Sequence, residues 1–482
     1  TGASTTIDRN VTLSAGITST IEVAQASTNL TLSGATAATT GALIKAGSGT
    51  LVLTGANLHT GSTTISAGTL QIGNGGTTGT PGAGAVVNNA ALAFNRSDTA
   101  TFANLISGSG TVTQAGTGNV VLTNRNTYTG ATTINAGTFT LENDVPSLSS
   151  SLYSGNGLFV IQPGSASFTS AFTLDRTKFT SSIGGLTVGK PGNATDIIVN
   201  ADITTAGNQS YYGPVKVGAD VTLTSTNADL IISGSILPDT HGTRSLVMNA
   251  RNGYVTIGAD IGSLSKAFYN LQINTQGMQV NRDTGFYTTN DVMMDFAITK
   301  SSGPDATFTV KAGRHISFGS NTSITSTAGK LNLLLDADTG RTGNGIIQYL
   351  GSSIATNGGY IQTGTGATIG GGIMVGGDIY LSRAGAQSIT TSGGSITING
   401  EMIVAATGGL TISAGSGNVD FKGVLNSGNT YSFVDKSANG STLNWDWARN
   451  DAKNGTAGGS AVGNSYLVNI SSRLENAIAG LA

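Results

Sequence analysis

The stretch LIKAGSGTLVLTGANLHTGSTTISAGTLQI, residues 43–72, decides the fold because a second stretch repeats it: VTQAGTGNVVLTNRNTYTGATTINAGTFTL, residues 112–141. The two align without gaps at an offset of 69 residues, and 15 of the 30 positions are identical. Internal repeats are typical of solenoids, in which each unit buries its apolar face against the next unit. The sequence therefore predicts a repetitive architecture.

Three short strands are expected in the first copy. Leu51 and Leu53 share one strand face, Thr63–Ile65 forms a second strand, and Leu70 and Ile72 share a face of the third. Glycines separate these strands and allow sharp turns. The offset of 69 residues would correspond to three coils of about 23 residues. We expect an all-β fold, a right-handed parallel β-helix, with a β-sandwich or jelly roll as the alternative.

The composition agrees with many short strands and excludes several other classes of protein. The 482 residues include 71 Gly and 7 Pro, with 38% hydrophobic and only 10% charged residues. This hydrophobic fraction allows a buried core, and the absence of Cys excludes disulfides and thiolate metal sites. The net charge of -2 gives no electrostatic footprint for nucleic acid. No apolar segment has the length of a membrane-spanning helix.

The two copies resemble the autotransporter-associated β-strand repeat of bacterial surface proteins, and residues 94–112 resemble the lead-in found beside it. Residues 150–425 resemble the filamentous-haemagglutinin-like repeats of large adhesins. There, residues 245–262 and 409–425 each read as a strand, a Gly turn and a second strand. These resemblances imply one solenoid segment over residues 1–145, another over residues 146–427, and a location outside the bacterial cell.

The segment 428–482 has a different character and predicts a small α+β unit. Ser472 and Glu475 form a capping box that opens a helix. Trp445, Ala448 and Ala452, the strand at residues 466–470, and the helix with Ser472, Glu475 and Asn476 resemble the first half of a C-type lectin-like domain. The half that carries this family's calcium and glycan ligands would follow Ala482, so no binding residue is assigned. A helical cap over the β-helix is the alternative.

Few residues are candidates for chemistry. Asp336 and Asp338, with Asn344 nearby, could begin a calcium loop, but they lack the distal Glu, so a polar turn between coils is favoured and calcium binding is left open. His59, His241 and His315 lack metal-ligand spacing. His59 aligns with Tyr128 of the second copy, which predicts that His59 lies at the surface and is not a metal ligand. No catalytic, cofactor-binding or metal-binding residue and no cofactor is therefore expected.

Three functions are compatible with this reading. The first is a non-catalytic extracellular adhesin or stalk that presents the C-terminal module to glycans or to cell-surface or matrix molecules. The second is a subunit of an extracellular filament, sheath or surface layer, formed by end-to-end self-association. The third is a polysaccharide-cleaving β-helix enzyme, which is disfavoured because the acidic residues are sparse and isolated.

Overall fold

In the computed structural model, the residues that are described form an all-β fold, a β-solenoid of about 16 parallel coils with almost no helix among them. The structure describes residues 4–146, 148, 150–180, 183–339 and 345–364, and then shorter stretches. Those stretches are 368–369, 373–374, 378–381, 385–399, 402–404, 410–414, 419–421, 425–427, 432–434 and 442–444. The predicted fold class is confirmed. The helices predicted for the C-terminal segment, with Trp445 and Ser472, fall on residues outside the described ones.

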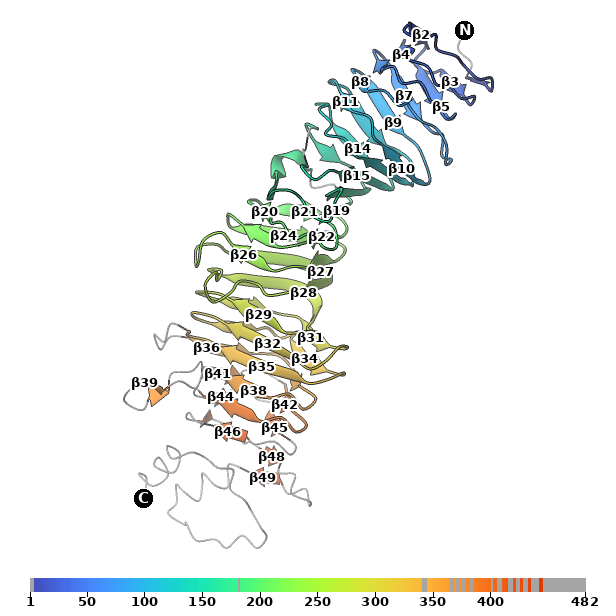
Figure 1. The fold of residues 1–482 in the computed structure, drawn as a ribbon. Coiled ribbons are helices and arrows are strands. Elements are labelled where there is room, and N and C mark those ends of the chain that lie inside the picture. The colour runs from blue at the N-terminus through green and yellow to red at the C-terminus, as the bar shows by residue number, and fades with distance from the viewer. Residues whose placement is uncertain are drawn as a thin grey trace, which may run out of the picture. The chain divides into compact units, whose positions relative to one another are not determined.

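The chain divides into two compact units, described separately here. Unit 1 comprises Thr1–Val215 and Thr224–Ile231, and unit 2 comprises Lys216–Leu223 and Ile232–Ala482. In each unit, strands from successive coils lie side by side (Figure 1). The predicted change of repeat style near residue 145 stays a prediction.

Three parallel sheets contain most of the strands of unit 1, and β18 (Phe172–Leu174) and β20 (Ile197–Val199) pair in a further one. The five-stranded sheet has the order β11 (Ile106–Ser107), β8 (Val86–Asn88), β6 (Thr63–Ile65), β4 (Ala42–Ala46) and β2 (Thr18–Glu22). The eight-stranded sheet has the order β1 (Thr5–Ile7), β3 (Asn29–Leu32), β5 (Thr50–Leu53), β7 (Thr69–Ile72), β9 (Ala91–Phe94), β12 (Thr111–Gln114), β14 (Thr132–Ile134) and β16 (Tyr153–Ser154). The third sheet contains β10 (Thr99–Phe102), β13 (Asn119–Leu122), β15 (Thr138–Glu142), β17 (Leu158–Gln162) and β19 (Gly185–Gly189).

Unit 2 repeats the same design with longer coils. One sheet column runs through β27 (Leu246–Ile257), β28 (Leu271–Gln279), β30 (Val292–Met294), β33 (Ile316–Phe318), β36 (Ile346–Tyr349), β41 (Asp378–Leu381), β44 (Met402–Val404) and β47 (Leu425–Ser427). A second runs from β28 through β31 (Ala297–Lys300), β34 (Ser323–Ser326), β37 (Ser353–Ala355), β42 (Gln387–Thr390), β45 (Leu410–Ser413) and β48 (Ser432–Val434), with β49 (Thr442–Asn444) antiparallel. A third contains β29 (Thr284–Tyr287), β32 (Ala306–Lys311), β35 (Leu331–Asp336), β38 (Ile361–Thr363), β43 (Ile396–Ile398) and β46 (Val419–Phe421).

The remaining elements are short. They are β18 (Phe172–Leu174), the 3-10 helix η1 (Arg176–Lys178), β20 (Ile197–Val199), β21 (Ile203–Thr205), β22 (Gln209–Tyr212), β23 (Val215–Val217), β24 (Val221–Ser225), β25 (Leu230–Ile232), β26 (Ile236–Pro238), β39 (Thr368–Ile369) and β40 (Ile373–Met374).

The core of unit 1 forms as the apolar alternation predicts. Leu51, Leu53, Leu70 and Ile72 are all at most 1% exposed, and the outward Gln71 lies between two of them. Each such buried side chain contributes about 1.5–3 kcal/mol through the hydrophobic effect. The turns need glycine because Gly68 has φ +64° and its counterpart Gly137 has φ +61°, a region that disfavours other residues.

The two repeat copies lie on different faces of the coil, which corrects the predicted coil length. Strand pairing carries Leu43 to Thr63, Val86 and Ile106 in steps of 20, 23 and 20 residues. Val112, the counterpart of Leu43, lies six residues further along, in the eight-stranded sheet. An offset of 69 residues therefore corresponds to three full coils and six further residues, which take the chain from one sheet to the next sheet of the same coil.

The same shift holds throughout the copy. Strands β4 and β6 of the first copy belong to the five-stranded sheet, whereas their counterparts β12 and β14 belong to the eight-stranded sheet. Strands β5 and β7 belong to the eight-stranded sheet, whereas β13 and β15 belong to the third. One local sequence thus produces the same strand–turn pattern on whichever face it occupies. The repeat is a local folding unit and does not mark one common surface.

Candidate functional site

His59, which aligns with Tyr128 of the second copy, lies in the interior of the coil, so the surface position predicted for it is wrong. His59 is fully buried, and its Nδ1 lies 3.0 Å from Thr36 Oγ1 while its Nε2 lies 3.0 Å from Thr63 Oγ1. The Thr63 hydroxyl donates to the Pro81 carbonyl at 2.7 Å, so it must accept from Nε2–H. The unprotonated Nδ1 then accepts a hydrogen bond from the Thr36 hydroxyl. Burial lowers the pKa of His59, in keeping with this neutral form.

Tyr128, the counterpart of His59, has the same role on another face. It is also fully buried, and its hydroxyl lies 2.8 Å from Thr132 Oγ1. Burial raises the pKa of Tyr128 to about 12, so the phenol stays protonated. In both copies a polar interior side chain therefore pairs with the threonine four residues later. These groups are satisfied structural elements and are inaccessible to an external ligand.

The other two histidines act at the coil edges. His241 is exposed, and its Nδ1 accepts the Ala267 N–H at 3.1 Å. The His315 Nδ1 accepts the Ile346 N–H at 3.2 Å. Each imidazole therefore connects one coil to the next. Among the residues that the structure describes, no three His, Asp or Glu side chains are grouped closely enough to hold a metal ion.

The proposed calcium loop begins in a buried position. Asp336 ends β35 and is 4% exposed, while Asp338 is 3% exposed and has φ +59°. The Asp338 N–H donates to the Arg314 carbonyl at 3.1 Å, which fixes the turn to the preceding coil. Asn344 lies outside the described residues. Calcium binding at Asp336 and Asp338 stays open.

Among the acidic side chains of unit 2 that the structure describes, six serve as brackets between coils, a role that the sequence reading missed. In each bracket, an Asp side-chain oxygen accepts a backbone N–H from the next coil, 24–26 residues later. The pairs are Asp220 with Ser245, Asp260 with Gly285, Asp283 with Thr307, Asp291 with His315, Asp295 with Asn321 and Asp305 with Lys330. A search of the sequence for Asp residues 24–26 positions before the start of a predicted strand could have found them.

Arginines neutralise two of the acidic groups of unit 2. Arg244 Nε donates to Asp239 Oδ1 at 2.8 Å, and this bonding lowers the pKa of Asp239 to about 2. Arg314 makes a two-point contact with Asp291, and although burial opposes the shift, the hydrogen bonds from Arg314 and the His315 N–H lower the pKa of Asp291. These carboxylates stay ionised at neutral pH and are occupied as acceptors, which suits a structural role better than general acid catalysis.

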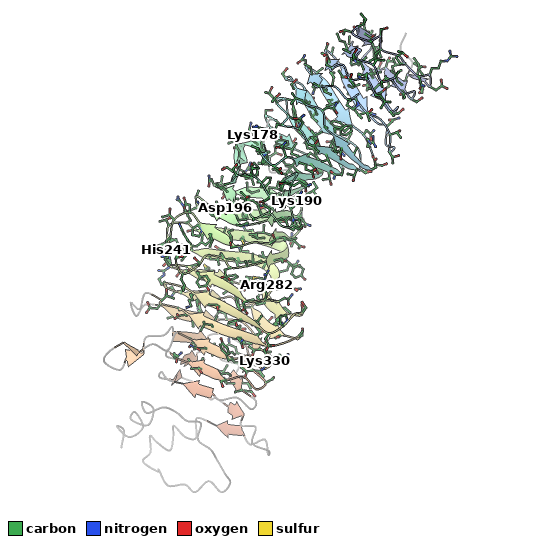
Figure 2. All side chains as sticks on the ribbon, in the orientation of Figure 1. Lys178, Lys190, Asp196, His241, Arg282 and Lys330 are labelled. Atoms are coloured by element: carbon green, nitrogen blue, oxygen red, sulfur yellow. The ribbon has the colours of Figure 1, made fainter. Side chains whose placement is uncertain are left out.

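The outer surface of the coils carries scattered charges. Figure 2 labels Lys178, Lys190 and Asp196 in unit 1 and His241, Arg282 and Lys330 in unit 2, all on the outside of the coils. They are separated along the chain and form no run of one sign. No helix in the described part of the chain is long and apolar enough to cross a membrane.

Comparison with known proteins identifies the repeats. The family model described as the passenger-associated-transport-repeat matches residues 43–72 and residues 112–141, the two copies described above. Repeats of this type occur in autotransporter passenger domains, and the match implies secretion to the cell surface. No curated protein and no solved structure matches the chain. The predicted resemblance is thus confirmed for the repeats, whereas the lectin-like part lies in residues that the structure does not describe.

Proposed function

We propose that this chain is the β-solenoid of an extracellular bacterial adhesin or stalk with no catalytic role. The observation that carries the proposal is the pair of transport-repeat matches inside a continuous series of parallel coils. Such a scaffold extends by adding coils, each of which contacts only its neighbours. A solenoid of this kind can therefore hold a binding module away from the cell simply by adding further coils of the same design.

The module itself is proposed from sequence alone. The resemblance of residues 445–476 to the opening of a C-type lectin-like domain supports a C-terminal binding element with glycan or matrix partners. The non-catalytic role is supported by the acidic side chains of unit 2, which are engaged as acceptors of backbone N–H groups and Arg donors.

Labelling of intact producing cells tests the location. An antibody raised against the purified chain should bind intact bacteria, and added protease should remove the signal. A signal that appears only after the cells are permeabilised would contradict the proposal. Incubation of the purified chain with acidic polysaccharides tests the third function, since release of reducing or unsaturated ends would revive the enzyme.

A subunit of an extracellular filament, sheath or surface layer remains the second candidate. The solenoid is built from parallel strands paired coil to coil, and a solenoid strand edge can pair with a second copy of the chain. Electron microscopy of the native material distinguishes the candidates, since regular fibres of repeating subunits favour the filament and isolated rods favour the stalk.

A further inference from the structure

Strand β27 contains a β-bulge that replaces a predicted turn. We expected residues 245–262 to form two strands joined by a Gly turn, but β27 runs without a break from Leu246 to Ile257. Ala250 pairs with Thr275 and Tyr254 pairs with Gly277, so four residues of β27 advance against two of β28. Bulges of this kind redirect side chains and are enriched next to functional sites.

A buried threonine holds the bulge in place. Thr275 is 9% exposed, and its hydroxyl accepts the Val255 N–H at 3.1 Å and donates to the Gly253 carbonyl at 2.8 Å. Both backbone groups lie in or beside the bulge, where the regular ladder is interrupted. The bulge is therefore a specified feature, because a buried side chain satisfies the groups that it leaves without ladder partners.

The bulge places the ring of Tyr254 across the neighbouring strand. A Cβ at Gly277 would lie 3.2 Å from the Ala297 carbonyl oxygen, 3.3 Å from Tyr254 Cε1 and 3.5 Å from Cδ1, so the ring lies against the backbone of β28 at Gly277. Tyr254 is nevertheless 52% exposed. One side of the ring thus lies against strand β28, and about half of the residue is accessible to solvent. This is the geometry of a stacking surface.

Four polar residues lie close to Tyr254 in sequence or in strand register: Arg251 and Asn252 in the bulge of β27, and Asn274 and Gln276 in β28 near its partner Gly277. With Tyr254 they form what we call the Tyr254 platform. Arg251, Asn252 and Gln276 are exposed. Asn274 is held in place because its Nδ2 donates to Asn249 Oδ1 at 2.5 Å and its Oδ1 accepts Gln272 Nε2 at 3.2 Å. The platform therefore combines one aromatic face with several amides and one cation.

We propose that the Tyr254 platform binds a pyranose ring of an extracellular polysaccharide. The C–H face of a pyranose is apolar and stacks on an aromatic ring, while its hydroxyls both donate and accept hydrogen bonds. Amides offer donors and acceptors in the same way, and Arg251 offers donors alone. A single cation is too little for nucleic acid, whose binding depends on many phosphate contacts. This site goes beyond the proposed function because it lies on the solenoid and does not use the C-terminal segment.

Affinity electrophoresis of the full chain tests the site. The gels contain a neutral polysaccharide (galactomannan, xyloglucan or a β-glucan) or an acidic one (polygalacturonate or alginate). The native chain should be retarded, and Tyr254→Ala should weaken binding about tenfold, as expected for a lost stacking contact. Tyr254→Phe should retain binding, because the phenyl ring keeps the aromatic stacking face.

Tyr269→Ala is the matched control, since Tyr269 is 46% exposed in the same unit but lies outside the platform. Circular dichroism verifies that each variant is folded. If acidic gels retard the native chain but not Arg251→Gln, the ligand is an acidic sugar. If neutral gels retard the native chain, the ligand is a neutral sugar. The proposal is overturned if no gel retards the native chain, or if Tyr254→Ala and Tyr269→Ala bind alike. Because purified protein is used, this result is independent of where the chain resides in the cell.

Discussion

The imidazole of His59 lies 3.0 Å from the hydroxyl of Thr63 inside the first transport repeat, with both side chains almost fully buried. Tyr128 and Thr132 form the same pair in the second repeat, at 2.8 Å. The pair is conserved in geometry between the copies although its first member changes from imidazole to phenol. The sequence motif therefore specifies an interior polar contact, and this contact has measurable consequences.

Acidification should destabilise the coils around His59. The folded-state pKa of His59 is lowered by burial from the ordinary value of 6.5. The folded state therefore binds fewer protons than the unfolded state, and the stability contributed by neutral His59 is present above about pH 6.5 and is lost as the pH falls toward the folded-state value. The urea midpoint of the native chain should fall between pH 7.5 and 5.

The variant His59→Gln provides the control for this pH effect. Glutamine can still bond to a hydroxyl but does not titrate in this range. The part of the pH dependence due to His59 should disappear in this variant. An unchanged pH dependence would show that His59 does not titrate on unfolding.

Loss of the buried ammonium of Lys45 should be costly. Lys45 is fully buried, and its Nζ donates to the carbonyls of Ala46, Gly47 and Ala67 at 2.8, 2.7 and 3.0 Å. Lys45→Met leaves all three acceptors without this donor, so we expect a loss of about 3 kcal/mol in local stability. Hydrogen exchange of the amides in residues 42–72 measures it.

The second repeat supplies the matched control for Lys45. Gln114 occupies the equivalent position and donates through Nε2 to the carbonyls of Gly116 and Gly118 at 2.9 and 3.0 Å. Lys45→Gln should therefore cost less than half as much as Lys45→Met. Equal losses in the two variants would mean that chain volume at this position, and not donation to the turn, stabilises the coil.

The carboxylate brackets of unit 2 should depend on an acceptor oxygen and not on charge. Asp305 Oδ1 accepts the Lys330 N–H at 2.8 Å. Asp305→Asn keeps an acceptor oxygen, whereas Asp305→Ala removes it and should cost about 1 kcal/mol. Hydrogen exchange at Lys330 should accelerate in the Ala variant only, and equal acceleration in both would show that charge matters more.

Strong acid should weaken the turn held by Asp239. The Arg244 hydrogen bond lowers the pKa of Asp239 to about 2, below the ordinary 3.8. A lowered carboxylate pKa adds stability above pH 3.8, and that stability is lost as the pH falls from 3.8 toward 2. Asp239→Asn should flatten this part of the acid-unfolding curve. A curve identical to that of the native chain would contradict the assignment.

The apolar part of the fold could be predicted from local sequence. Leu70 and Ile72 alternate with the half-buried Thr69 and Gln71, and period-2 alternation predicts their buried face, whereas in β5 Val52 is buried together with Leu51 and Leu53. Turns at Gly68 and Gly137 could also be predicted locally, because glycine tolerates a positive φ. Both residues have a positive φ in the structure.

The polar parts could not be predicted because their partners lie one coil away. Nothing near His59 in the sequence shows that Thr36 bonds to its imidazole or that Pro81 accepts the hydroxyl of its partner Thr63. The bulge at Gly253 resembles a turn in sequence, and only the Thr275 hydroxyl of the next coil shows that the strand continues. The coil length was mispredicted because a repeated sequence can recur on a different face.

Spin labels test most directly the claim that the two repeats are one local unit placed on different faces. The chain has no Cys, so labels can be attached at introduced pairs without background. Pairing carries the outward Gln71 through Ala93 and Thr113 to Thr133 on one sheet. Labels at residues 71 and 133 should therefore lie about 14 Å apart, three strand spacings, and broaden the spectrum. Labels at 64 and 133, equivalent positions of the two repeats, should lie on different faces and show much weaker broadening. The reverse result would contradict the account, because it would mean that 69 residues make three whole coils.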